Sequence, residues 1–189
     1  FSGIKKSYHL VAPIIRKPDI MANLIEKHSV RVLPCSPTFL NMMYLDRIFD
    51  DYELKSLRLV TYGTERMPEE LLKRLSNKLP RVKFLQTFGT SEIGIVKTKS
   101  LSSSSTYITI DDPNVDWKID NNELWIKSNK QILCYMNTDE EVMSDGWFKT
   151  GDLVKVNNEN FFKIVGRKKE VINVGGEKVL PAEIEDFVM

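Results

Sequence analysis

The segment Gln86–Glu92, with the sequence QTFGTSE, combines residue types that can bind a phosphorylated ligand. A glycine lets a ligand approach the backbone, hydroxyl groups can donate hydrogen bonds to phosphate oxygens, and a carboxylate can bind Mg²⁺ through oxygen. The apolar run before this segment predicts a strand, and ligands of open parallel sheets gather at the carboxyl ends of the strands. Taken alone, the heptapeptide is more simply interpreted as a polar turn after a strand.

A similar arrangement follows the preceding predicted strand, where Thr61–Arg66 has the sequence TYGTER. Both segments place an aromatic residue, a glycine and a threonine at the end of a strand. If the two strands are neighbours, their ends meet at one edge of the sheet, so we expect Tyr62–Glu65 and Gln86–Glu92 to line one crevice. Two unrelated strand-ending glycines are the alternative.

Two further segments carry a charged side chain beside a glycine. Thr150-Gly151-Asp152 places a carboxylate just before a predicted strand, where it can accept hydrogen bonds from two neighbouring ribose hydroxyls. The alternative is a solvated turn aspartate. In the segment Gly166–Glu185, GRKKEVINVGGEKVLPAEIE, Arg167 offers a planar guanidinium to a ribose or a phosphate.

The elements that would position these residues alternate between helix and strand up to about Ser102. Apolar spacing and prolines predict helices over residues 18–29, 36–49 and 68–79, with Asp19 and Ser36 as N-caps of the first two. Short apolar runs predict strands over residues 30–37, 57–62 and 82–88. This alternation is typical of the α/β class, in which helices cover parallel strands.

The pattern changes after Ser102. Ser100–Ser105, SLSSSS, is by composition a flexible linker or loop. Short predicted strands follow over residues 106–110, 115–120, 122–128, 153–157 and 160–166. The clusters Asp120–Asn122 and Asn157–Asn160 indicate hairpin turns between them. These features predict a small antiparallel sheet or barrel.

Composition is that of an ordinary soluble domain, with 42% hydrophobic residues, 28% charged residues and a net charge of +1. The near-neutral charge argues against nucleic acid as a partner. No apolar run is long enough to span a bilayer, and no secretory signal is evident. Cys35 and Cys134 are 99 positions apart and are expected to be reduced, which predicts a cytoplasmic protein.

Together these segments resemble the adenylate-forming (AMP-binding) enzyme superfamily, which includes acyl-CoA synthetases, nonribosomal-peptide adenylation domains and firefly luciferase. FGTSE is similar to the family element Y-G-x-T-E, and GWFKTGDL is similar to G-W-x-x-T-G-D. The segment GRKKEVINVGGEKVLPAEIE resembles the element that begins with Gly-Arg and ends with Glu-Ile-Glu. These motifs stand in the family's order and cover nearly the whole chain.

The resemblance implies roles for individual residues. Phe88 would stack on adenine, Ser91 would contact the α-phosphate, and Glu92 would bind Mg²⁺. Asp152 would hold the ribose hydroxyls, with support from Arg167. The full set implied to bind the nucleotide is Tyr62, Gly63, Thr64, Glu65, Gln86, Thr87, Phe88, Gly89, Thr90, Asp152 and Arg167. Ser91, Glu92 and Lys169 are implied to take part in catalysis.

The implied reaction activates a carboxylic acid with ATP and Mg²⁺ as an acyl-adenylate and then transfers the acyl group to a thiol. Coenzyme A is the expected acceptor, and the phosphopantetheine of a carrier protein is the alternative. The resemblance also implies that Lys169 stands at the position about which a small C-terminal domain would turn between the two half-reactions. The expected division is an α/β subdomain over residues 1–102, an antiparallel β subdomain over 103–166, and a hinge with the start of the mobile domain over 167–189.

Some positions depart from the family pattern. Phe88 replaces the usual tyrosine, Ser91 replaces threonine, and Asn173 stands where lysine is common. The family's upstream phosphate loop and its C-terminal catalytic lysine have no counterpart in this sequence. We therefore expect the chain to be an inactive piece of a larger ligase, with a non-catalytic nucleotide-binding module as the alternative. The sequence names neither the acid nor the oligomeric state.

Overall fold

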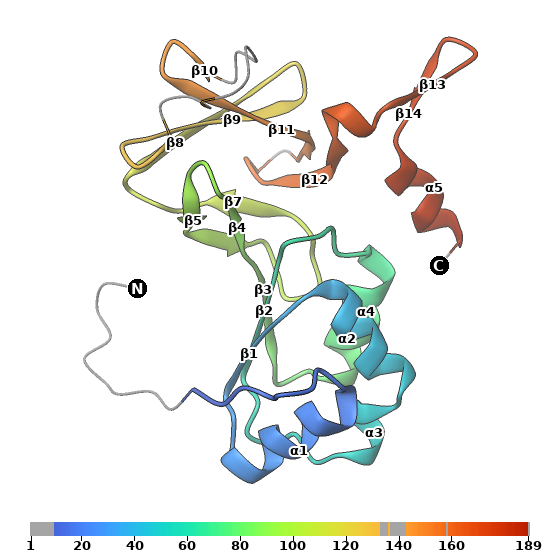
Figure 1. Cartoon of the computed structure of the whole chain (residues 1–189). Helices are drawn as coiled ribbons and strands as arrows, with labels where there is room; N and C mark the ends of the chain where they lie inside the picture. The colour runs from blue at the N-terminus through green and yellow to red at the C-terminus, as the bar shows by residue number, and fades with distance from the viewer. Residues whose placement is uncertain (1–9, 133–135, 137–142, 158, 189) are drawn as a thin grey trace.

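The computed structural model describes residues 10–132, 136, 143–157 and 159–188. The first part of the chain forms a three-stranded parallel sheet of order β1-β2-β3, with helices gathered beside it (Figure 1). The strands are β1 (Val32–Cys35), β2 (Leu59–Tyr62) and β3 (Lys83–Gln86). The helices are α1 (Pro18–His28), α2 (Pro37–Leu45), α3 (Ile48–Asp51) and α4 (Glu69–Lys78). The predicted α/β alternation is confirmed.

The helix ends follow local capping chemistry, with two differences from expectation. Ser36 caps α2 as predicted, because its Oγ accepts a hydrogen bond from the Phe39 N–H at 3.2 Å. The N-cap of α1 is Lys17 rather than Asp19, since Pro18 already occupies the first helical position. The helix predicted over residues 36–49 is interrupted at Arg47, whose φ of 56° is incompatible with a continuous helix.

The first hydrophobic core lies between the helices and one face of the parallel sheet. Alternate strand residues point into it, as in β2, where Val60 and Tyr62 are each 1% exposed. α4 contributes a buried face from Leu71, Leu72 and Leu75. This core fixes the positions at which β2 and β3 end, and those strand ends carry the first group of candidate site residues.

A seven-stranded antiparallel sheet follows, with the order β6-β7-β12-β11-β9-β8 and with β10 paired to β11. Its strands are β6 (Thr98–Ser100), β7 (Ile108–Ile110), β8 (Val115–Asp120), β9 (Glu123–Ser128), β10 (Met143–Ser144), β11 (Trp147–Val156) and β12 (Phe162–Arg167). Asn121 and Asn122 connect β8 to β9 with φ values of 50° and 63°, as a type I′ turn requires. The predicted antiparallel sheet and its asparagine turn are confirmed.

The second hydrophobic core begins at Phe88, only four positions after the last member of the first core, Phe84. Between the parallel and antiparallel sheets, β4 (Phe88–Thr90) and β5 (Gly94–Val96) form a hairpin that the sequence did not indicate. The second core is completed by residues of the antiparallel sheet, including Ile108, Leu124, Ile126 and Phe162. The change of core therefore falls next to the QTFGTSE segment.

The serine-rich segment starts with Ser100, the last residue of β6, and continues as a loop, and it is attached to the edge of the parallel sheet. Ser103 Oγ accepts a hydrogen bond from the Phe84 N–H at 3.0 Å, and Ser100 Oγ accepts one from the Gln86 N–H at 3.3 Å. These hydroxyls accept hydrogen bonds from backbone N–H groups of β3 on the side of the strand that is not paired with β2. The segment is therefore a cap for the sheet edge and not a free linker.

The C-terminal segment leaves β12 through a short 3₁₀ turn, η1 (Lys168–Glu170). A hairpin of β13 (Ile172–Val174) and β14 (Glu177–Val179) follows, then α5 (Pro181–Val188). Gly175 and Gly176 form the hairpin turn with φ values of 59° and 94°, which glycine tolerates well. Figure 1 shows these elements beside the antiparallel sheet.

Candidate functional site

The ends of β2 and β3 lie in direct contact. Tyr62 pairs with Gln86, and the Thr87 N–H donates to the Tyr62 carbonyl oxygen at 2.7 Å. A β-carbon at Gly63 would lie 2.5 Å from Thr87 Oγ1 and 2.9 Å from the Thr87 carbonyl oxygen, so this approach requires glycine. The two strand ends are therefore neighbours, as the repeated aromatic-Gly-Thr pattern predicted.

The aromatic side chains at these ends are covered. Tyr62 is 1% exposed in the first core, and Phe88 is 5% exposed in the second. Gln86, predicted to line the base, is 8% exposed. A ring needs an exposed face to stack on adenine, so the role predicted for Phe88 requires that its ring be uncovered when a nucleotide binds. In the described conformation the ligand-accessible part of the edge is polar.

Thr64 and Glu65 follow Gly63 on the exposed side of the strand end. Thr64 has a φ of 71°, and its hydroxyl donates to the Gly63 carbonyl oxygen at 2.5 Å. Glu65 accepts from the Thr38 N–H at 3.1 Å and from Thr38 Oγ1 at 2.6 Å. Burial acts to raise the pKa of Glu65, but the hydrogen bonds from Thr38 and Ser36 hold this pKa below its ordinary value. Glu65 thus binds the first turn of α2.

Cys35 lies near this carboxylate and is a free thiol. Burial, with a smaller contribution from Glu65, raises the pKa of Cys35 to about 12. A thiol with so high a pKa is a poor nucleophile at neutral pH. Cys134 lies outside the described residues.

Ser91 and Glu92 lie at the tip of the β4–β5 hairpin. Gly89 is required inside this hairpin, since a β-carbon there would lie 2.6 Å from the Gly94 carbonyl oxygen. The Glu92 N–H donates to Thr90 Oγ1 at 3.2 Å, which fixes the turn. Ser91 is exposed and Glu92 is half-buried. The tip therefore offers one hydroxyl and one carboxylate to the surface.

Asp152 and Arg167 form the second group of predicted residues. They pair directly across β11 and β12, and Arg167 Nε lies 3.0 Å from Asp152 Oδ1. Arg167 Nη1 also donates to the Thr150 carbonyl oxygen at 2.9 Å. Asp152 lies within β11 rather than before a strand: the pairing of β11 is irregular here, and Gly151 has a φ of 73°.

Burial shapes the charge of Asp152, which is 4% exposed. Loss of hydration raises its pKa to about 6, although the Arg167 charge and a Thr150 hydrogen bond act to lower it. Glu170 and Glu123 add smaller effects that raise the pKa. Asp152 is therefore a buried acceptor held by a guanidinium, and not the solvated turn aspartate of the alternative interpretation.

Glu123 and Lys168 are charged residues beside this pair that the motifs did not indicate. Glu123 is 4% exposed and opens β9. Its Oε1 accepts from the Gly151 N–H at 3.1 Å, and its Oε2 lies 2.8 Å from Lys168 Nζ. The only sequence signal was an acid at the first position of a strand, which does not by itself indicate burial.

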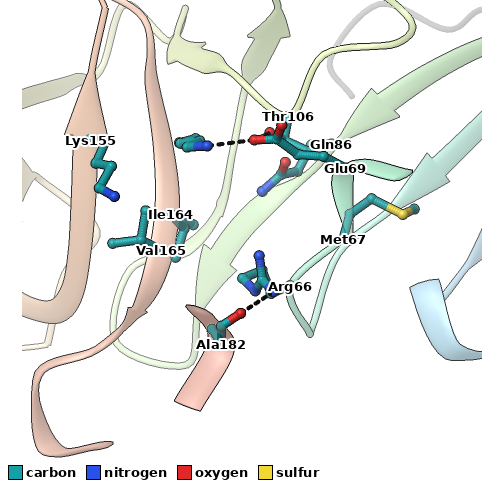
Figure 2. Close-up of a pocket in the computed structure, with 10 residues that line it drawn as sticks. Arg66, Met67, Glu69, Gln86, Thr106, Lys155, Ile164, Val165 and Ala182 are labelled. Carbon is teal, nitrogen blue, oxygen red and sulfur yellow. Dashed lines mark hydrogen bonds and ion pairs between the residues drawn. The ribbon is translucent and has the colours of Figure 1, made fainter. Parts of the chain in front are cut away.

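A pocket connects the strand ends with β12. It is lined by Arg66, Met67, Glu69, Gln86, Thr106, Lys155, Lys163, Ile164, Val165 and Ala182 (Figure 2). Glu69, at the start of α4, accepts from Lys163 Nζ at 2.5 Å, and Arg66 Nη2 donates to the Ala182 carbonyl oxygen at 3.0 Å (Figure 2). Gln86 is the predicted residue that this pocket includes. Ion pairing and hydrogen bonding thus bring three separate parts of the chain together around it.

Lys169 lies in the middle of η1, between the antiparallel sheet and the C-terminal hairpin. Lys168, Lys169 and Glu170 are all exposed. The Arg167 N–H donates to Glu170 Oε2 at 3.3 Å, which closes the short turn. A three-residue connection of this kind can absorb a change in backbone dihedral angles without disturbing either core.

Comparison with known proteins identifies the family. The model of the AMP-binding enzyme family matches residues 7–133, which is more than half of the chain. The chain therefore belongs to the AMP-binding enzymes, and the resemblance drawn from its motifs is confirmed.

Individual relatives agree with this assignment. The chain is 30% identical to 4-coumarate-CoA ligase 1 of Narcissus pseudonarcissus over 201 residues, which cover 93% of the chain and 37% of the relative. The chain spans just over a third of the length of this relative and of two others, 4-coumarate--CoA ligase 5 of Oryza sativa subsp. japonica and acyl-CoA synthetase 7 of Caenorhabditis elegans.

Solved structures share the fold. o-Succinylbenzoate CoA synthetase of Bacillus subtilis superimposes with a TM-score of 0.74 at 23% identity, over 90% of this chain and 38% of that one. A fatty acyl CoA synthetase of Mycobacterium tuberculosis gives a TM-score of 0.69 at 26% identity, over 89% and 37%. The α/β layer and the antiparallel sheet are therefore parts of this family's architecture.

Membrane spans and clustered metal ligands were assessed from the geometry of residues 10–132, 136, 143–157 and 159–188. None of their helices has the length and apolar character needed to cross a membrane. No group of three or more His, Cys, Asp and Glu side chains within the described ranges is arranged to hold a metal ion.

Proposed function

We propose that the protein containing this chain activates a carboxylic acid with ATP as an acyl-adenylate and passes the acyl group to coenzyme A. The main support is the Asp152–Arg167 pair, a buried carboxylate held by a guanidinium on adjacent strands in a member of the AMP-binding family. A carboxylate in this state can accept hydrogen bonds from two ribose hydroxyls. The CoA ligases among the relatives support a thiol as the acceptor.

The chemistry requires donors and cations where negative charge develops on the phosphorus oxygens. The exposed hydroxyl of Ser91 is our proposed donor to the α-phosphate. Thr64, Thr87 and Thr90 would contribute from the same edge, and Gly63 and Gly89 would let the nucleotide approach the backbone. Lys169 would be the pivot for the second half-reaction. The proposed division of the chain remains residues 1–102, 103–166 and 167–189.

Glu92 is our proposed ligand for Mg²⁺. Mg²⁺ in nucleotide sites is held by one or two carboxylates together with substrate phosphates and water, so a single half-buried carboxylate at an ordered turn fits this pattern. When bound, Mg²⁺ would neutralise phosphate charge. The protein would hold the Glu92 carboxylate and the Ser91 hydroxyl together on the β4–β5 hairpin.

The first test is carboxylate-dependent exchange of pyrophosphate into ATP by the complete gene product that contains this chain, with a panel of aliphatic and aromatic acids. We expect exchange only when an accepted acid is present, and this chain alone is expected to be inactive. A complete gene product that shows no exchange with any acid would instead favour a non-catalytic nucleotide-binding module.

The second test identifies the thiol. The complete gene product is incubated with ATP and an accepted acid, together with either free coenzyme A or a phosphopantetheinylated carrier protein. Formation of acyl-CoA supports the proposal, whereas acylation of the carrier alone would favour the alternative acceptor.

Our proposed location is the cytoplasm, which fractionation of cells expressing a tagged gene product would test.

A further inference from the structure

Glu123 is a carboxylate placed where water cannot solvate it. Its side chain is 6% exposed, and Leu153 of β11 lies opposite it in the sheet. Burying an unpaired carboxylate is costly, so such a group is retained only when it is paired and hydrogen-bonded. Both oxygens of Glu123 meet this condition, and each has a different partner.

The two partners of Glu123 lie on the same side of the Asp152–Arg167 pair, because β11 and β12 are antiparallel and the residue before Asp152 therefore faces the residue after Arg167. Oε1 accepts from the backbone N–H of Gly151, the residue directly before Asp152. Oε2 pairs with Lys168, the residue directly after Arg167. One side chain therefore contacts the neighbour of each member of the pair.

The hydrogen bond from the Gly151 N–H to Glu123 stabilises an irregular part of β11. The ladder from β11 to β9 is interrupted between Lys149 and Leu153, and Gly151 has a left-handed φ of 73°. Thr150 donates to the Leu124 carbonyl oxygen at 2.7 Å and accepts from the Asp152 N–H at 3.1 Å. The Glu123 carboxylate thus replaces a missing ladder contact and fixes the turn that presents Asp152.

The Lys168 contact acts on the connection to the C-terminal segment. Lys168 opens η1 and immediately precedes Lys169. The Lys168 side chain is 66% exposed, so solvent reduces the energy of the pair, but its ammonium contacts a carboxylate whose side chain is only 6% exposed. The ion pair therefore ties the start of this connection to β9.

We propose that Glu123 is a positioning residue for the nucleotide site, and this inference depends on the function proposed above. Through Gly151 it orients Asp152 for the ribose, and through Lys168 it holds the beginning of the η1 connection. Neither contact touches the reacting atoms. One carboxylate therefore contacts both the turn that is proposed to bind the ribose and the start of the η1 connection.

The test uses the complete gene product with an acid that supports exchange. Glu123→Ala removes both contacts, and Glu123→Gln keeps an oxygen that can accept from Gly151 while it removes the ion pair. Lys168→Gln removes the ion pair from the other side. Glu70 and Lys73 form a matched control, an ion pair of the same 2.8 Å length on the surface of α4.

Glu123→Ala is expected to raise the KM for ATP about tenfold or more, because Asp152 loses its orientation. The KM for the acid should change less than about twofold. The two glutamine variants should raise the KM for ATP less, but each should change the ratio of thioester formation to exchange at least about threefold. The double variant that combines Glu123→Gln with Lys168→Gln should show the same change in this ratio as each single variant. All three variants remove the same ion pair, so their effects should not add. Glu70→Gln and Lys73→Gln should change neither quantity.

The outcomes separate the two proposals. Wild-type exchange is measured first, and its absence would contradict the proposed function itself. If the wild type is active but Glu123→Ala raises the KM for ATP and for the acid equally, Glu123 has only a structural role. An unchanged ratio in both Glu123→Gln and Lys168→Gln would also overturn the inference. Because Glu123→Ala can fail to fold, the thermal midpoint of each variant is recorded, and the glutamine variants then decide.

Discussion

The two groups of candidate residues are held in place by different forces. The strand-end group around Gly63 and Thr87 is positioned by shape, through backbone hydrogen bonds and contacts too close for any side chain. The group around Asp152 is positioned by charge, through a buried carboxylate, a guanidinium and a second buried acid. Substitutions in the first group should therefore act on stability, and substitutions in the second should act on ligand binding and its pH dependence.

The largest expected effect belongs to the charged group. Asp152→Ala in the complete gene product should weaken ATP binding at least about 100-fold, because two hydrogen bonds to a charged acceptor are lost. Calorimetric titration with ATP measures this directly. Glu70→Gln, an exposed acid on α4, is the control and should bind normally. Unchanged ATP affinity in Asp152→Ala would remove this residue from the site.

The shape-controlled group is tested by Gly63→Ala. The added β-carbon would lie 2.5 Å from Thr87 Oγ1, so the free energy of unfolding should fall by about 1–3 kcal/mol. Denaturant unfolding measures this loss. Adding Thr87→Ala should restore part of it, because the hydroxyl is the nearer of the two obstacles and the Thr87 carbonyl oxygen remains. A loss below about 0.5 kcal/mol would show that the strand ends are not tightly packed.

Ligand affinity should depend on pH because the group around Asp152 is held by charge. Burial raises the pKa of Asp152 to about 6, and the charged groups facing it are Arg167, Glu170 and Glu123. Protonation removes the charged acceptor, so affinity should fall about tenfold from about pH 7.5 to about pH 5. Adenosine is the appropriate probe, because the phosphates of ATP titrate in the same range.

Asp152→Asn provides the control for this profile and should bind adenosine weakly with little change over the same range. A profile in the wild type as flat as in this variant would contradict the assignment.

The stability of the protein should change with pH in the opposite direction to the binding affinity. The native pKa lies above the ordinary value of 3.8, so the folded state keeps the proton longer, and the free energy of unfolding should decrease as pH rises from about 4 to about 6.

The smallest expected effect concerns the connection after Arg167. Lys169→Pro should lower thioester formation about fivefold more than exchange, because proline fixes φ where the proposed hinge must change it. Rates of both half-reactions are measured on the same preparation. Lys169→Ala serves as the control for the side chain. Equal loss of both half-reactions in Lys169→Pro would argue against a hinge at this residue.

Much of the fold could be predicted because local signals were strong. Prolines and apolar spacing indicated α2 and α4, and Asn121-Asn122 indicated the turn between β8 and β9, because these asparagines adopt the left-handed backbone that the turn requires. The break at Arg47 gave no such signal. Arginine rarely adopts positive φ, and the break lets both Met43 and Ile48 reach the core.

Part of the arrangement of the candidate residues was predictable. The sequence correctly indicated that the ends of β2 and β3 are neighbours, because strand ends follow from pattern. It placed Asp152 before a strand, whereas Asp152 lies within β11 opposite Arg167. Burial of Phe88 and the contact of Glu123 with Lys168 could not be predicted. Both depend on residues far apart in sequence, and a single sequence contains no pairing information for such contacts.

We propose that both groups bind one nucleotide, and a crystal structure of the complete gene product with AMP bound would test this. We expect the ribose hydroxyls to lie within hydrogen-bonding distance of the Asp152 carboxylate, with the base against the Gly63 and Gln86 strand ends and the phosphate near Ser91. AMP bound with its ribose away from Asp152, or in contact with only one of the two groups, would contradict it.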